Sequence, residues 1–285
     1  MRHVLRSVPA LLLLFLIQVL PAGAQAPAAA QGAVPELFHA LPTRPGVSVA
    51  LALIDTPQPK AAVLLLAGGG GSLGITDAGG AAQVARAGNF LVRSRRLFAA
   101  HGLAVAVLDA PSDWEGGMTP RFRCSDSHLA DLRAVVAFLT ARWGMKPWVV
   151  GTSMGSISAG WAAANLGGDI AGVGLTSSVT RVGKRWDIPA AFSRGTLSTG
   201  LDKVVVPALV ARHDNDSCVS SPPSAAPRIL EALTAAPRKT LLTFTGGKPA
   251  QSVECEPQSP HGYFGIEERA VDGMAAFMLD GVLRR

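Results

Sequence analysis

Residues 147–166, PWVVGTSMGSISAGWAAANL, contain the stretch that decides the fold. Residues 147–152 are a mostly apolar run of the kind that forms a strand buried on both faces of a parallel sheet. Residues 154–166 are small and uncharged, and they predict a closely packed helix. Gly151 and Gly155 flank Ser153 in a G-x-S-x-G pattern, whose glycines permit a cramped strand-to-helix turn that lifts the serine hydroxyl out of the backbone. The stretch therefore predicts a nucleophilic serine in the turn between a buried strand and a helix.

The same five-residue pattern also occurs at residues 70–74, around Ser72. Ser72 follows an apolar run as well, but residues 75–80 after it make a poor helix. Ser153 has both the strand before it and the helix after it, so we prefer Ser153 as the nucleophile. The alternative is that Ser153 only caps the helix that follows it.

Apolar runs and helical patterns alternate along the rest of the chain. Strands are expected at 47–54, 61–67, 103–109, 147–152, 170–176, 204–211 and 239–245, and helices at 89–101, 127–143, 154–166, 223–234 and 267–279. This alternation predicts an α/β fold with a mostly parallel central sheet and helices on both faces. It fills residues 47–285 with a single domain, in which residues 179–201 are the one excursion that could form a small cap.

The first 24 residues have the pattern of a secretory signal peptide. Arg2 and Arg6 precede an apolar run over residues 8–20, and Ala22-Gly23-Ala24 forms a small-residue cleavage site. Because the run is short for a spanning helix, we expect export to the periplasm or the medium, with no stable membrane anchor after cleavage. An uncleaved N-terminal anchor is the alternative. Residues 25–46, rich in Ala and Pro and without a clean period, are expected to form a tether or a loosely packed arm.

The composition narrows the classes of function. The chain is 48% hydrophobic and only 16% charged, which argues against a disordered protein. Its net charge of +6 comes from scattered Lys and Arg without aromatic interleaving, so the charge predicts a general surface potential and not a nucleic-acid site. The sequence has no H-E-x-x-H and no paired C-x-x-C, so we expect neither a metal nor another cofactor. It leaves the oligomeric state open.

Two acidic residues follow the strand expected at 204–211. Asp214 and Asp216 both lie where a parallel strand ends, at the edge where open α/β sheets bind ligands. His261 is the only histidine between the last strand and the last helix, and His213, just before the acids, is its one serious rival. A serine, an acid and a histidine in this chain order are the components of a catalytic triad.

In this order, Ser153, the acidic loop and His261 resemble the α/β-hydrolase fold superfamily of serine hydrolases. The resemblance extends from about residue 47 to residue 279. It implies acyl transfer, in which Ser153 attacks an ester, thioester or amide carbonyl and His261 takes the serine proton. The acid would orient the imidazole and stabilise its charged form, and water would then release the acyl group.

The resemblance also bears on which aspartate is the acid. In that superfamily the acid often lies in a G-x-x-D-x-x-V pattern. Here His213 replaces the glycine, Asp216 takes the position of the acid and Val219 follows it. This alignment favours Asp216 over Asp214, which would then be a turn-forming or loop residue.

The resemblance further implies an oxyanion hole that contains two backbone N–H groups. One would come from Met154, directly after the nucleophile. The other would come from the loop that begins at Ala67, which takes the position of the H-G-x-x motif; Gly69 is the expected donor and Gly70 the second choice. Ala67 replaces the usual histidine of the motif, which puts the anchoring of this loop in doubt but not its backbone donors. A flexible loop without this role is the alternative.

The three cysteines all lie in the part of the chain that would be exported, where disulfides are favoured. Cys218 lies two residues after Asp216, and Cys255 lies six residues before His261. A Cys218–Cys255 bridge would therefore tie the acidic loop to the histidine loop and leave Cys124 free. Pairing of Cys124 with either partner, or no bridge at all, is the alternative.

Residues of the expected substrate pocket are harder to identify. The aromatic candidates, for each of which ordinary packing is the alternative, are Trp114, Trp186, Tyr263 and Phe264. Arg121 and Arg123 share a loop with Trp114 and could steer an anionic substrate, although exposed surface positions are the simpler expectation.

The expected function is hydrolysis of a small-molecule carboxylic ester through Ser153, Asp216 and His261, in a fairly open site. A serine peptidase or an acyltransferase on the same triad is the first alternative. A binding protein that keeps the fold without catalysis is the second.

Overall fold

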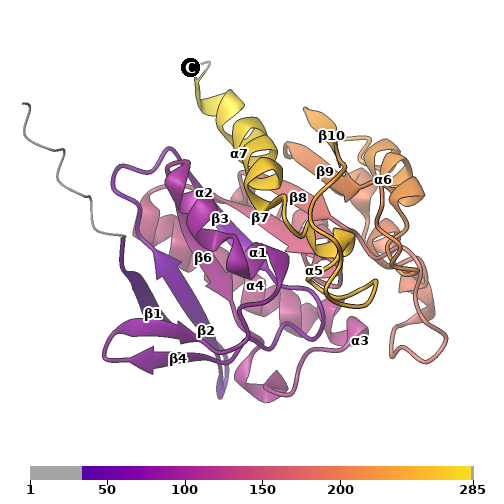
Figure 1. The fold of residues 1–285 in the computed structure, drawn as a ribbon. Helices are drawn as coiled ribbons and strands as arrows, with labels where there is room; N and C mark the ends of the chain where they lie inside the picture. The colour runs from indigo at the N-terminus through magenta and orange to yellow at the C-terminus, as the bar shows by residue number, and fades with distance from the viewer. Residues whose placement is uncertain (1–33, 284–285) are drawn as a thin grey trace, which may run out of the picture. The chain divides into compact units, whose positions relative to one another are not determined.

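A computed structural model describes residues 34–283. The predicted signal peptide and residues 25–33 of the predicted arm lie outside the described residues. The rest of the chain builds a ten-stranded sheet in the order β10-β9-β8-β7-β3-β6-β2-β1-β5-β4 (Figure 1).

Six strands of this sheet run parallel and form its centre and one edge. They are β3 (Ala61–Leu66), β6 (Leu103–Leu108), β7 (Pro147–Thr152), β8 (Gly172–Thr176), β9 (Ala208–His213) and β10 (Lys239–Phe244). The opposite edge is antiparallel, from β2 (Val47–Ile54) outward. Since β7 pairs with β3 on one side and β8 on the other, the turn that carries Ser153 begins near the middle of the sheet.

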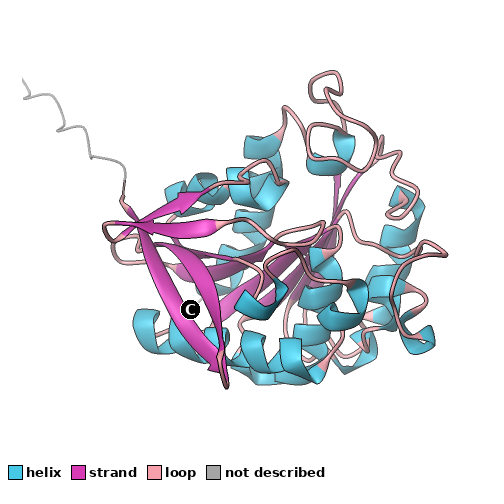
Figure 2. Ribbon diagram, turned by 90° about the horizontal axis from the view of Figure 1, so that it is seen from below, coloured by secondary structure: helices cyan, strands magenta, loops and turns pink. Residues whose placement is uncertain are grey.

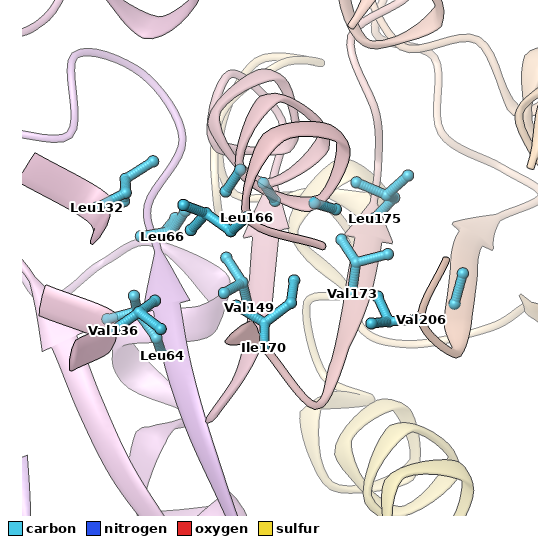
Figure 3. Close-up of a cluster of buried hydrophobic side chains, with 14 of the residues drawn as sticks. Leu64, Leu66, Leu132, Val136, Val149, Leu166, Ile170, Val173, Leu175 and Val206 are labelled. Carbon is cyan, nitrogen blue, oxygen red and sulfur yellow. The ribbon is translucent and has the colours of Figure 1, made fainter. Parts of the chain in front are cut away.

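Helices cover both faces of the sheet (Figure 2). One face carries α4 (Asp126–Trp143), α5 (Gly155–Leu166) and α6 (Ala226–Ala232), and the other carries α1 (Phe90–Arg93), α2 (Arg95–Ala100) and α7 (Glu267–Leu283). The period of two along a strand divides the core accordingly. Leu64 and Leu66 pack toward α4 and α5 (Figure 3), while Val63 and Leu65 pack on the opposite face. Each of these strand leucines is almost fully buried, a burial worth roughly 1.5–3 kcal/mol.

The predicted arm is wrong over its second half, because residues 36–44 form the strand β1 (Glu36–Arg44). It pairs antiparallel with β2 through a tight turn at Gly46, whose φ of +71° suits glycine. Leu37 and Leu41 pack on the core beside α4. The contacts with α4, more than eighty residues later in the chain, help to hold the strand, and the Ala- and Pro-rich composition of residues 25–46 does not reveal them.

Two more strands and a helix break were not predicted. The strands β4 (Ile75–Ala78) and β5 (Ala81–Val84) form a hairpin around Gly79 and Gly80, both with positive φ. The helix expected at 89–101 is divided into α1 and α2 at Ser94.

The segment proposed as a cap contains two short 3-10 helices, η3 (Ala190–Phe192) and η4 (Gly195–Ser198). It packs on α5, where the hydroxyl oxygens of Thr196 and Ser156 lie 2.8 Å apart. Among residues 34–283, no helix is both long and apolar enough to cross a membrane.

Candidate active site

Ser153 lies on the turn between β7 and α5 with a φ of +52°, a backbone conformation that residues other than glycine rarely adopt. Its backbone N–H donates to the Thr176 carbonyl at 3.0 Å. The turn leaves no room beside it: a Cβ on Gly151 would lie 2.1 Å from the Gly155 oxygen, and one on Gly155 would lie 2.3 Å from the Leu66 oxygen. Both glycines of the pattern are therefore sterically required, and the strain concentrates at the serine.

His261 and Asp216 meet across two loops. His261 Nδ1 lies 2.9 Å from Asp216 Oδ2, and both residues are buried. The other carboxylate oxygen, Oδ1, accepts the backbone N–H of Cys218 at 2.9 Å. Ser221 Oγ lies 3.0 Å from His261 Nδ1 and donates to Asp216 Oδ2 at 3.3 Å. The carboxylate is thus held on both oxygens, and its contact fixes the orientation of the imidazole.

The rival acid and base face other partners. Asp214 is exposed and pairs with Arg212 at 3.1 Å. His213 is buried, with Nε2 at 2.8 Å from the Gly246 carbonyl and Nδ1 accepting the Asn215 N–H at 3.1 Å. Both ring nitrogens of His213 are therefore used within the protein, whereas His261 Nε2 is buried without a hydrogen-bond partner among the described residues.

A cavity of about 300 Å³ opens beside these residues and is lined by both Ser153 and His261. Its other walls come from the segments 68–73, 88–90 and 255–257, with Arg86, Thr152 and Gly262. The predicted cap contributes none of these residues, so the site has no lid from that segment. No hydrogen bond joins Ser153 to His261 within the described structure; catalytic hydrogen bonds of this kind often tighten only around the bound substrate.

The loop from Gly68 to Gly71 forms one wall of the cavity and touches Ser153. A Cβ on Gly68 would lie 2.9 Å from Ser153 Cβ, so only glycine allows this approach. The loop is a turn in which the Gly71 N–H donates to the Gly68 carbonyl at 3.1 Å and Gly69 has a φ of +56°. The N–H groups of Gly69, Gly70 and Met154 donate to no acceptor in the part of the chain that the structure describes. These predicted donors are therefore free for a ligand.

Ser72, the serine of the second G-x-S-x-G pattern, lines the same cavity. Its hydroxyl donates to the Glu115 carbonyl at 2.6 Å and accepts from Arg86 at 3.1 Å. These partners include no imidazole that could take its proton.

Comparison with known proteins finds resemblance in structure only. No family model matches the chain, and no curated protein matches its sequence. Solved structures match over most of their length, among them Est1E from Butyrivibrio proteoclasticus, with a TM-score of 0.59, 15% identity and coverage of 87% of this chain and 100% of that one. The chain has the α/β-hydrolase fold.

Two further α/β-hydrolase structures show the range of the likeness. XC6422 from Xanthomonas campestris, described as an α/β serine hydrolase without lid, has a TM-score of 0.52, 19% identity and coverage of 88% and 94%. A proline iminopeptidase of Mycobacterium smegmatis has a TM-score of 0.58, 12% identity and coverage of 87% and 99%. At these low identities the comparison establishes the fold alone. The predicted α/β fold class is thereby confirmed.

The expectation that Arg123 is a surface residue is wrong. Only 1% of Arg123 is exposed, because the short helix α3 (Pro120–Arg123) directs it behind the glycine loop that walls the cavity. Its guanidinium donates to the carbonyls of Ala67 and Gly69 and to Ser158 Oγ. Burial lowers the pKa of Arg123 to about 10, so the side chain stays charged at neutral pH. Arg121, by contrast, is exposed and pairs with Asp187.

The disulfide Cys218–Cys255 is present, with 4.7 Å between the Cα atoms, and Cys124 is free and buried. It joins the loop after β9, which carries Asp216, to the loop after β10, which carries His261. Burial raises the pKa of the Cys124 thiol to about 12.

None of the four aromatic residues suggested for the pocket is among those lining the cavity. Tyr263 is fully buried, with its ring 4.6 Å from that of Phe90, and Trp114 packs on Phe122. Trp186 packs with a small cluster that includes Met154 and does not line the cavity. Phe264 is half-buried. The lining instead includes Asn89, a residue that carries no sequence signal, because its loop reaches the site only through tertiary folding.

Proposed function

We propose that this protein is a serine hydrolase that cleaves carboxylic esters of small molecules. The observation that supports this most is the 2.9 Å contact between His261 Nδ1 and Asp216 Oδ2 beside a strained Ser153, in a cavity that His261 and Ser153 share. Perturbed geometry and buried polar groups without partners are typical of functional sites. Esterases are among the structural neighbours, which supports the same class of chemistry.

In the proposed mechanism, Asp216 accepts a hydrogen bond from the Nδ1–H of His261, which leaves Nε2 unprotonated and able to take a proton. The Ser153 hydroxyl gives its proton to Nε2 as Oγ attacks the ester carbonyl. The negative charge that develops on the carbonyl oxygen is stabilised by the N–H of Met154 and by an N–H of the glycine loop. His261 then returns the proton to the leaving alcohol, and water releases the acyl group from Ser153 by the same steps.

The test is covalent labelling with a fluorophosphonate probe, with Ser72→Ala as the matched control for Ser153→Ala. Both serines lie in a G-x-S-x-G pattern and line one cavity. We expect labelling of the wild type and of Ser72→Ala, and none of Ser153→Ala. If labelling is lost in Ser72→Ala instead, Ser72 is the nucleophile and the assignment of Ser153 is wrong. A folded wild type that is not labelled would contradict the proposed hydrolase function. A series of p-nitrophenyl esters beside matched anilides separates an esterase from a peptidase.

We also propose that the protein is exported. The sequence of residues 1–24 and the disulfide, which forms in oxidising compartments, support this location. N-terminal sequencing of the protein made by its own host is expected to begin at Gln25. A chain that retains Met1 in the cytoplasm would contradict export.

A further inference from the structure

Arg123 is a buried cation without a carboxylate partner among the described residues. Removing a guanidinium from water is costly unless its N–H groups are satisfied. Two of its nitrogens are: Nη1 donates to Ser158 Oγ at 2.9 Å, and Nη2 donates to the carbonyls of Gly69 at 2.8 Å and Ala67 at 3.3 Å. Its two carbonyl partners therefore belong to the loop that walls the cavity.

The groups around Arg123 leave its charge uncompensated. His128 lies 3.0 Å from Ser158 Oγ, and burial, followed by the charges of Arg123 and Arg44, lowers its pKa to about 3. The neighbouring Cys124 is also neutral at pH 7, since burial raises its pKa to about 12. The guanidinium thus presents a full positive charge to the back of the glycine loop, at low effective dielectric.

The loop needs an anchor because its backbone is adaptable. Gly69 and Gly70 are the two central residues of the turn closed by the bond from Gly71 N–H to the Gly68 carbonyl. Turn types differ in the orientation of the peptide between these residues, and with glycine at both positions neither orientation is excluded sterically. The bond from Arg123 to the Gly69 carbonyl selects one of them.

The selected orientation fixes a donor. In a planar trans peptide the C=O and the next N–H point in opposite directions. Because the Gly69 carbonyl points toward the buried guanidinium, the Gly70 N–H points away from it. That N–H has no acceptor within the described residues, and Gly70 lines the cavity beside Ser153.

We propose that Arg123 is the positioning residue of the oxyanion hole: from the buried side it holds the peptide between Gly69 and Gly70 so that the Gly70 N–H meets the substrate oxygen. The inference rests on the proposed hydrolase function and refines it, since it makes Gly70 the loop donor in place of Gly69. It also supplies the anchor that Ala67, in place of a histidine, cannot provide. The charge behind the loop adds to the stabilisation of the oxyanion.

The test compares Arg123→Met and Arg123→Lys with Arg95→Met as a matched control. Arg95, on α2, is another poorly exposed arginine; it is bound to Glu36 and to the Val92 carbonyl and lies outside the cavity lining. Since one oxyanion donor is worth about 10²–10³ in kcat, we expect Arg123→Met to lower kcat roughly 10- to 100-fold, with KM changed less than about 3-fold. Arg123→Lys, whose ammonium group can reach only one of the two carbonyls, should have a kcat roughly 3- to 10-fold below that of the wild type.

Two further measurements separate positioning from mere stability. The affinity for a trifluoromethyl ketone, which forms a tetrahedral adduct with the serine, should fall by the same factor as kcat/KM. Amide hydrogen exchange of the segment 68–73 should become roughly 10-fold faster in Arg123→Met, while Arg95→Met leaves the exchange of this segment and kcat at wild-type values. If Arg123→Met does not fold, the same measurements on Arg123→Lys test whether Arg123 positions the loop.

The outcomes are distinct. Unchanged kcat and unchanged loop exchange in folded Arg123 variants would overturn the inference, as would a loss confined to KM or equal losses in Arg95→Met. If the wild type neither hydrolyses esters nor reacts with the fluorophosphonate, the proposed function fails. The exchange of segment 68–73 then still decides whether Arg123 anchors the loop.

Discussion

Two aspartates that are two residues apart in one loop have opposite surroundings. Asp216 is 7% exposed and contacts His261, whereas Asp214 is exposed and faces Arg212. Because an asparagine lacks the carboxylate's charge and can turn its own N–H toward Nδ1, which selects the wrong imidazole tautomer, we expect Asp216→Asn to lower kcat at least about 10²-fold. Asp214→Asn should stay within about 2-fold of the wild type, since it removes one surface pair. Rates with a p-nitrophenyl ester at pH 7.5 measure both.

The ranking of these variants is the informative result. If Asp214→Asn were the more damaging variant, the roles assigned to the two aspartates would be reversed. The preference for Asp216 came from a pattern around Val219, and the structure adds its burial and its contact with His261. Ser221, which touches both Asp216 and His261, has no such pattern and could not be found in the sequence.

The packing of one helix against another makes stability depend on pH. His128 on α4 is buried and lies 3.0 Å from Ser158 Oγ on α5. Burial, together with the charges of Arg123 and Arg44, lowers its pKa from 6.5 to about 3 in the folded protein. The unfolded chain therefore binds a proton at His128 below pH 6.5 that the folded chain excludes, so this contribution is present above pH 6.5 and is lost as the pH falls.

From this linkage we expect the free energy of unfolding to fall by about 2 kcal/mol between pH 7 and pH 5 on account of His128 alone. The measurement is urea denaturation at both values. In His128→Gln the free energy of unfolding should differ much less between the two pH values, whatever the stability of the variant at pH 7. An equally steep fall in the variant would show that other groups cause the pH dependence.

Elements with a complete local pattern could be predicted, and elements that depend on distant partners could not. The strands β3 and β6 are unbroken apolar runs, β7 is mostly apolar, and α4 shows its buried face at helical spacing, so their sequences suffice. The strand β1 has no such run. It is held by β2 and, at one position, by β5 through the pairing of Leu37 with Ala81, across more than forty residues.

The same distinction applies to the site over the whole molecule. Ser153, Asp216 and His261 could be named from chain order, because each follows a particular strand of the sheet. Arg123 could not, because its burial depends on carbonyls of a loop more than fifty residues earlier in the chain. The aromatic residues suggested for the pocket do not line the cavity, because nearness to the site in the sequence does not determine the direction of a side chain.

The disulfide joins two loops that otherwise meet only through folding of the whole sheet. It links residues 37 apart in sequence, and closing a loop of that length stabilises by about 4 kcal/mol on the chain-entropy model. We expect the double variant Cys218→Ala/Cys255→Ala to unfold roughly 10 °C below the wild type in calorimetry. Because the bridge also holds the loops of Asp216 and His261 together, kcat should fall several-fold at temperatures where the variant is folded. Cys124→Ala, which removes the free thiol, is the control and should keep wild-type kcat; an unchanged melting temperature in the double variant would show that the sheet alone holds the two loops.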